Sequence, residues 1–228
     1  MRRSPSRRRS GSSRSSSGSG PSQGPTPTVS PGIRSRSSLT GPTMSGMTDQ
    51  TYDDMWVAPD EDPRESDSPP MGERDNYAAY LRHRRQTLEL KCDGLTPEQM
   101  AQRSVPPSSM SLLGLVRHLA EVERGWWRRT LAGEEADRLW GPPRADADFN
   151  NVVGDQAAVD DAWAAWREEV AYAEAWLAAH DDMGEVIDAG HHGELNVRDV
   201  VVHLIEEYAQ HLGHADLLRE CIDGSTGQ

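Results

Sequence analysis

The stretch NVRDVVVHLIEEYAQHLGHADLLRECIDG, residues 196–224, decides the fold because it has the pattern of one long helix. Asn196 and Asp199 make a capping-box-like pair at its start, and Gly224 marks its end. At about 100° per residue, side chains spaced by three and four positions share one face of a helix. The side chains with this spacing are Val200, Leu204, Glu207, His211, Ala215 and Leu218. The sequence therefore predicts a long helix with a single buried face.

Three further helices are predicted upstream of this one. From Glu73 onward apolar residues recur at helical spacing, and no convincing period-2 run indicates a strand. The predicted segments are residues 73–92, a helix that begins near Ser109 or Ser111 and ends at Gly133, and residues 156–179, with a short helical start at Thr96-Pro97-Glu98. Four long helices in about 150 residues predict an all-α fold, a four-helix bundle.

Two connections between the predicted helices stand out. Residues 134–154 form a segment longer than ordinary helix links, and such segments are often functional. Residues 190–193, Gly-His-His-Gly, are predicted to be a loop that precedes the last helix.

The N-terminal third of the chain differs from the rest in composition. Residues 1–47 hold eight Arg and no Asp or Glu, and are mostly Ser, Arg, Gly, Pro and Thr, which predicts a disordered tail. An alternative interpretation is a translation start at Met44, Met47 or Met55. Residues 48–72 are acidic and proline-rich, which predicts an extended arm. The predicted organisation is therefore tail 1–47, arm 48–72 and helical bundle 73–224.

Charge, hydropathy and cysteine content exclude several classes of protein. Beyond the tail, the chain is strongly acidic, which disfavours nucleic acid as a partner. No apolar run approaches 18 residues, so no membrane-spanning helix is predicted. Cys92 and Cys221 lie far apart, and no apolar signal-peptide stretch follows the first arginines. We therefore expect a reducing, cytoplasmic location.

The chemistry concentrates on the buried face of the last helix, where Glu207 and His211 stand between aliphatic residues. A carboxylate in a dry interior has to be paired, hydrogen-bonded or bound to a metal. One interpretation is structural, with the two side chains satisfying each other or a neighbouring Arg. The i, i+4 spacing also suits two ligands of one cation, as in helical zinc sites, and such a site needs a third ligand from elsewhere.

His118 is the leading candidate for that third ligand. It lies at the margin of the apolar face of the second helix, where Gly114 and Gly125 leave room for a cavity. His203 and His214 flank Glu207 and are interpreted as pocket residues, because one ion cannot bind all the histidines of this helix tightly. A di-iron carboxylate site and a Ser-His-Asp hydrolase are disfavoured, since the second Glu-x-x-His motif and the nucleophile elbow are absent from the sequence.

Two motifs carry a resemblance to a known family. SVPPSSMSLLGLVRHL at 104–119, followed by Glu121, Glu123 and Trp126-Trp127, and HLIEEYAQHLGH at 203–214, are similar to the DinB-like metalloenzyme superfamily. The closest likeness is to its actinobacterial branch, which resembles mycothiol-dependent maleylpyruvate isomerase and thiol S-transferases. The resemblance spans roughly residues 50–224.

The resemblance implies a divalent metal, zinc or nickel, held by His118, Glu207 and His211. Many members of the superfamily carry His where Glu207 stands, whereas Glu is found in the thiol-using branch. The implied function is an enzyme in which a low-molecular-weight thiol, mycothiol, is activated at the metal for S-transfer or isomerisation of an electrophilic substrate. The alternative is a non-catalytic metal-binding protein of a stress response. A homodimer is expected, because relatives often pair.

We assign roles to six further residues on this hypothesis. His203, His214 and Tyr208 are expected to relay protons, Arg82 and Arg117 to meet a carboxylate of the ligand, and Trp126 to line the entrance. Surface solvation is the alternative for both arginines, and core packing is the alternative for the tryptophan.

Overall fold

The structure is a computed structural model that describes residues 57, 61–65, 68–142 and 146–227. The predicted tail, residues 1–47, and most of the predicted arm, residues 48–72, lie outside the described residues.

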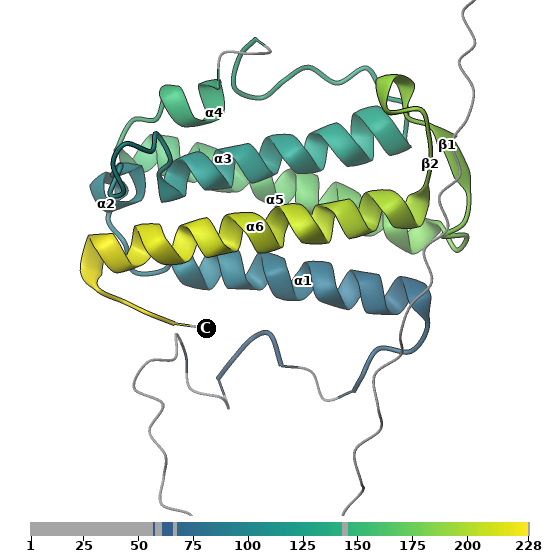
Figure 1. Ribbon diagram of the computed structural model, residues 1–228, viewed down its shortest axis with the longest axis horizontal. Helices are drawn as coiled ribbons and strands as arrows, with labels where there is room; N and C mark the ends of the chain where they lie inside the picture. The colour runs from purple at the N-terminus through teal and green to yellow at the C-terminus, as the bar shows by residue number, and fades with distance from the viewer. Residues whose placement is uncertain (1–56, 58–60, 66–67, 143–145, 228) are drawn as a thin grey trace, which may run out of the picture. The chain divides into compact units, whose positions relative to one another are not determined.

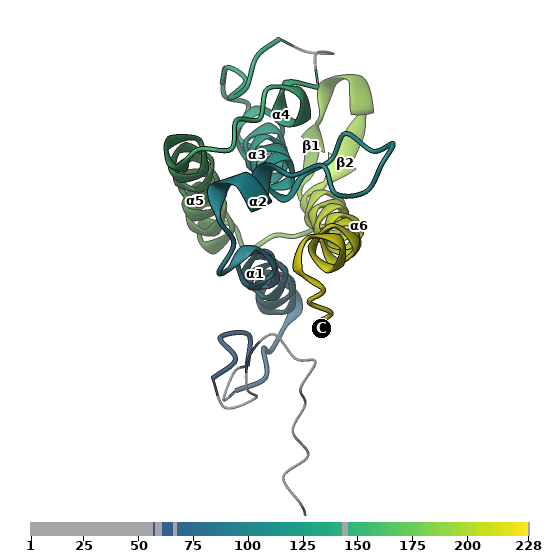
Figure 2. The ribbon, with the colours of Figure 1, turned by 90° about the vertical axis from the view of Figure 1, so that its left-hand side faces the viewer.

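Four long helices form the bundle, and the all-α fold class is confirmed. Figure 1 shows them side by side, and Figure 2, which looks along their axes, places them at the four corners of the bundle. The elements are α1 Glu73–Cys92, α2 Pro97–Ala101, α3 Leu112–Glu123, η1 Arg124–Leu131, α4 Ala147–Asn150, α5 Gln156–Ala179, β1 Val186–Asp188, η2 Gly190–His192, β2 Glu194–Asn196 and α6 Val197–Asp223.

The ends of the long helices follow local signals in the sequence. Ser111, rather than Ser109, caps α3, because its hydroxyl accepts a hydrogen bond from the backbone N–H of Gly114 at 3.1 Å. Asp155 caps α5 in the same way through the N–H of Ala158. Gly224 follows α6 with a φ of 82°, a left-handed conformation that glycine adopts without steric cost.

The long connection between the second and third main helices exists because α3 and α5 run in the same direction (Figure 1). The chain has to return along the length of the bundle before α5 can begin, as in bundles with a crossover connection. The described parts of this crossover, residues 132–142 and 146–155, lie along α3 and include the one-turn helix α4. The arrangement places an irregular segment next to the helix that carries His118.

Three features of the structure differ from the expectations. The prediction of no strands was wrong, because residues 186–188 and 194–196 pair as an antiparallel hairpin with Ile187 opposite Leu195. The predicted loop at 190–193 is the turn of that hairpin and contains the 3-10 helix η2. The second main helix does not continue as an α-helix to its end, since η1 is a π-helix of 8 residues.

The core lies between the four helices and is closed by leucine, alanine and aromatic side chains. Fully buried members from three of the helices include Leu81, Leu88, Leu115, Leu119 and Leu204. α3 packs mainly against α5, and α1 packs mainly against α6. Among the described residues, no helix is both long and apolar enough to cross a bilayer.

A buried polar network also crosses the core. The carboxylate of Glu123 is fully buried and accepts hydrogen bonds from the Arg85 guanidinium at 2.8 and 2.9 Å, from Trp127 Nε1 at 2.7 Å and from the Tyr208 hydroxyl at 2.7 Å. The same hydroxyl accepts from Trp166 Nε1 at 2.9 Å. These contacts join α1, α3, η1, α5 and α6 around one carboxylate.

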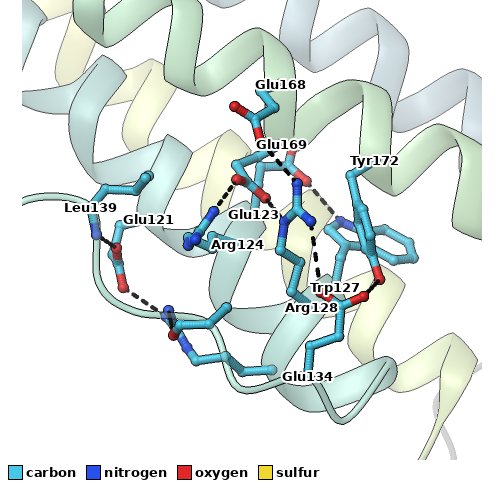
Figure 3. Close-up of polar contacts among 12 residues, drawn as sticks. Glu121, Glu123, Arg124, Trp127, Arg128, Glu134, Leu139, Glu168, Glu169 and Tyr172 are labelled. Carbon is cyan, nitrogen blue, oxygen red and sulfur yellow. Dashed lines mark hydrogen bonds and ion pairs between the residues drawn. The ribbon is translucent and has the colours of Figure 1, made fainter.

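A second carboxylate holds the π-helix against α5. Glu169 is 1% exposed and lies 2.6 Å from both Arg124 Nη1 and Arg128 Nε (Figure 3). The two arginines are four residues apart, so they lie on one face of η1 and reach the same partner.

Candidate metal centre

Three ionisable side chains converge between α3 and α6. His118 comes from α3, whereas Glu207 and His211 come from successive turns of α6. One ligand atom from each, a ring nitrogen or a carboxylate oxygen, lies within 4.8 Å of the others. All three are partly buried. Two imidazole nitrogens and one carboxylate oxygen form a donor set known from catalytic zinc sites, so the residues present fit a divalent metal.

The electrostatics of the cluster favour a neutral imidazole at His211. Its Nε2 lies 3.3 Å from Glu207 Oε2, and its ring centroid lies 4.7 Å from that of His118. The pKa of His211 is lowered to about 4 by burial first, and then by the neighbouring His118 and His214, against the opposing effect of Glu207. A neutral imidazole is the form that binds metals.

His118 has a partner on the crossover. Its Nδ1 lies 2.8 Å from Asp148 Oδ2, and its ring packs against Phe149 at a centroid distance of 5.1 Å. Burial raises the pKa of the Asp148 carboxyl, but the hydrogen bond with His118 and the charges of His118 and Arg117 outweigh it, so this pKa lies below its ordinary value.

Four further hydrogen bonds join the crossover to α3. Leu139 N–H donates to Glu121 Oε2 at 2.9 Å, a contact visible in Figure 3, and Trp140 Nε1 donates to the Arg117 carbonyl at 2.8 Å. The guanidinium of the same Arg117 donates to the carbonyls of Ala147 and Asn151, both at 2.9 Å. These contacts fix the segment that carries Asp148.

A cavity of about 640 Å³ opens beside His118. Its walls come from α3, η1, the crossover and the hairpin turn, and include Trp126, Arg129, Asp148 and His192. The Trp126 ring contacts the rings of His192 and His203, at centroid distances of 5.1 and 4.7 Å. The volume is that of an ordinary small-molecule site.

Two of the expected proton-relay residues border the cluster, and one does not. His203 Nε2 lies 3.4 Å from Glu207 Oε1, and His214 Nδ1 lies 3.4 Å from His211 Nδ1. Tyr208 is fully buried in the network around Glu123, where its hydroxyl both donates and accepts. Burial raises the pKa of Tyr208 well above its ordinary value, and its hydroxyl bonds Glu123 and Trp166 instead of a residue of the cluster.

Of the three residues expected to bind substrate, one lines the cavity beside His118 and two lie elsewhere. Trp126 lines the cavity beside His118. Arg117 is buried, donates to the carbonyl of Ala147 in α4 and stacks over Trp140 at 4.5 Å. Arg82 is exposed and lines a separate groove, together with residues of α1 and α5. The structure therefore does not bring the two arginines to the cavity beside His118.

Asp148 is the site residue that sequence reasoning missed. It lies in an irregular segment 30 positions from His118, where no periodic pattern marks an inward-facing side chain. The only available signal was the unusual length of the connection that contains it.

Comparison with known proteins identifies the family of the chain. The family model for mycothiol S-transferases matches residues 76–224. Searching the curated proteins gives no match. A solved structure, described as a conserved protein of locus from Enterococcus faecalis, aligns with a TM-score of 0.49 and 18% identity, over 68% of this chain and 99% of that chain. The match of the family model over more than half of the chain is decisive: the chain belongs to the mycothiol S-transferase family, a family of DinB-like proteins.

Proposed function

We propose that the protein is a metal-dependent transferase that joins the sulfur of mycothiol to an electrophilic carbon. The observation that carries the proposal is the convergence of His118, Glu207 and His211, together with a cavity of about 640 Å³ that His118 lines. The match to the mycothiol S-transferase family supports mycothiol as the thiol substrate. We propose zinc or nickel as the ion, since two imidazoles and one carboxylate suit both.

The proposed roles divide between holding charge and moving a proton. When bound, a divalent ion supplies the positive charge that stabilises a thiolate. His203 is the proposed acceptor of the thiol proton, because it lies beside Glu207 and is the more exposed of the histidines there, with a side chain 40% exposed. His214, beside His211, is the proposed second relay. Trp126 packs against the bound molecules and limits access of water.

The proposed transfer balances in atoms and electrons. The thiol gives its proton to His203, and its sulfur forms a bond to the electrophilic carbon. The bond from that carbon to its leaving group breaks, and the leaving group departs with the electron pair and receives the proton from His203. The products are a thioether and the protonated leaving group.

The test is conjugation of mycothiol by the full chain incubated with zinc. The electrophiles are monobromobimane and 1-chloro-2,4-dinitrobenzene, and the thioether is measured by mass spectrometry. We expect a rate above that of the mixture without protein, and a loss of about 100-fold or more in His203→Ala.

His180→Ala is the matched control, because this histidine stacks on Trp176 and touches neither the cluster nor the cavity beside it. It should keep the wild-type rate. No thioether above background with any electrophile, or equal rates for His203→Ala and His180→Ala, would overturn the proposal.

A further inference from the structure

The segment that faces His118 is built to present one carboxylate. α4 is a single helical turn, closed by hydrogen bonds from the N–H groups of Phe149 and Asn150 to the carbonyl of Asp146. Asp146 has a φ of 43°, in the left-handed region that a side chain other than glycine rarely adopts. Such a conformation persists where surrounding contacts hold it.

Most of the contacts that hold α4 come from the part of α3 that carries His118. Arg117, the neighbouring residue, donates to the carbonyls at both ends of α4. Phe149 packs over Gly114, where an added Cβ would meet its ring at 2.9 Å. Arg103 donates to the Phe149 carbonyl at 3.1 Å. Asp148 is thus held at its position by its neighbours on both sides.

An ionised carboxylate accepts hydrogen bonds and donates none. The 2.8 Å contact between Asp148 Oδ2 and His118 Nδ1 therefore requires the hydrogen on Nδ1. A neutral imidazole with its hydrogen there has a bare Nε2, which is the nitrogen able to bind a cation. Without a partner, a histidine side chain favours the other tautomer.

We propose that Asp148 is a positioning residue that fixes the tautomer and ring orientation of His118 for metal binding, and that Arg117 acts through α4 to hold Asp148. The inference rests on the ligand role proposed above for His118. It assigns Arg117 to the support of the site, in place of the contact with substrate expected from the sequence.

The first test determines which ring nitrogen of His118 carries the hydrogen in metal-free protein. Histidine labelled with ¹⁵N gives separate signals for a protonated and a bare ring nitrogen, and the spectrum of His118→Gln identifies those of residue 118. We expect the hydrogen on Nδ1 in the wild-type protein, a shift toward Nε2 in Asp148→Ala, and retention on Nδ1 in Asp148→Asn, whose amide oxygen still accepts the bond.

The second test measures zinc affinity by competition with a chelator. Loss of a carboxylate that orients a histidine ligand typically weakens metal binding by about 10- to 100-fold. We expect that loss in Asp148→Ala and a smaller one in Asp148→Asn. Arg117→Met, which removes both hydrogen bonds to α4 and leaves the carboxylate in place, should change tautomer and affinity in the same direction.

Asp188→Asn is the matched control. This residue lines the same cavity, but its Oδ1 accepts from the N–H of Gly190 in the hairpin. It should leave the tautomer and the affinity unchanged. A wild-type tautomer in Asp148→Ala, or an equal shift in Asp188→Asn, would overturn the role of Asp148, and an unchanged Arg117→Met would overturn that of Arg117.

The outcome is separable from that of the proposed function. A protein that fails to conjugate mycothiol still reports its tautomer and its zinc affinity. Conversely, a transferase whose tautomer does not depend on Asp148 would refute only the positioning role.

Discussion

Replacing Glu123 by Gln should strongly destabilise the bundle, because it leaves a buried cation without its counter-charge. Arg85 is 5% exposed and makes both its short hydrogen bonds to this carboxylate. The amide of Gln also puts an NH₂ group where Glu123 accepts two of its four bonds, so further donors lose their acceptor. Breaking a buried pair from one side costs about 3–5 kcal/mol.

That cost is a large fraction of the total stability of a domain, which is typically about 5–15 kcal/mol. For a domain of this size it corresponds to a fall in melting temperature of roughly 6–20 °C. The assay is urea unfolding followed by far-ultraviolet circular dichroism, with thermal unfolding as a second measure.

Glu174→Gln is the control for this prediction. Glu174 also pairs with Arg85, at 3.6 Å, but its side chain is 58% exposed. Exposed ion pairs contribute about 0–1 kcal/mol, so this variant should unfold close to the wild type. The reasoning is refuted if Glu123→Gln unfolds within about 1 kcal/mol of the wild type, as a surface substitution would.

Three further predictions follow from the buried groups. Glu169→Gln should cost about 1–3 kcal/mol in the same urea assay, less than Glu123→Gln, because its two arginine partners are near 20% exposed and can turn toward water; an equal cost would contradict this. Iodoacetamide should modify exposed Cys221 and spare buried Cys92 until the protein unfolds, and equal rates in the native protein would contradict the packing. Burial raises the pKa of Cys92 to about 12 from an ordinary value of 9.0. Between these pH values the folded state keeps a thiol proton that the unfolded chain loses. The free energy of unfolding should therefore fall as pH rises through this range, by up to about 1.4 kcal/mol per pH unit. Cys92→Ala should show a shallower alkaline decrease, and an identical slope would count against it.

The long helices were predictable because their signals are local. The predicted segments 73–92 and 156–179 match α1 and α5, because the apolar spacing lies within each segment, Gly94 follows α1 closely and Asp155 caps α5. The same holds for the start of α3 at Ser111, where the choice between two serines depended on which hydroxyl reaches an N–H three residues on.

The features that were missed depend on contacts between distant segments. The strands of the hairpin have three residues each, too few for an alternating pattern to be recognised. The π-helix keeps apolar residues at nearly helical spacing, so its wider turn becomes evident only from backbone hydrogen bonds that span five residues, such as that from the N–H of Ala132 to the carbonyl of Trp127 at 2.9 Å.

The candidate site was predictable to a similar extent. Glu207 and His211 lie one turn apart on one helix, and the resemblance to a family pointed to His118, so the three could be grouped before their geometry was known. The burial of Tyr208 and the partnership of Asp148 with His118 arise from packing between helices and along the crossover. No spacing within a single element encodes either of them.

The central claim is that His118, Glu207 and His211 hold one divalent ion, and elemental analysis tests it most directly. The full chain would be incubated with zinc, separated from free ion by gel filtration and analysed alongside Glu207→Ala and Glu206→Ala, the latter changing the adjacent exposed carboxylate of the same helix. We predict about one zinc ion per chain in the wild type and in Glu206→Ala, and a loss of the ion in Glu207→Ala. A wild-type protein without bound zinc, or a Glu207→Ala protein that retains it in full, would contradict the account.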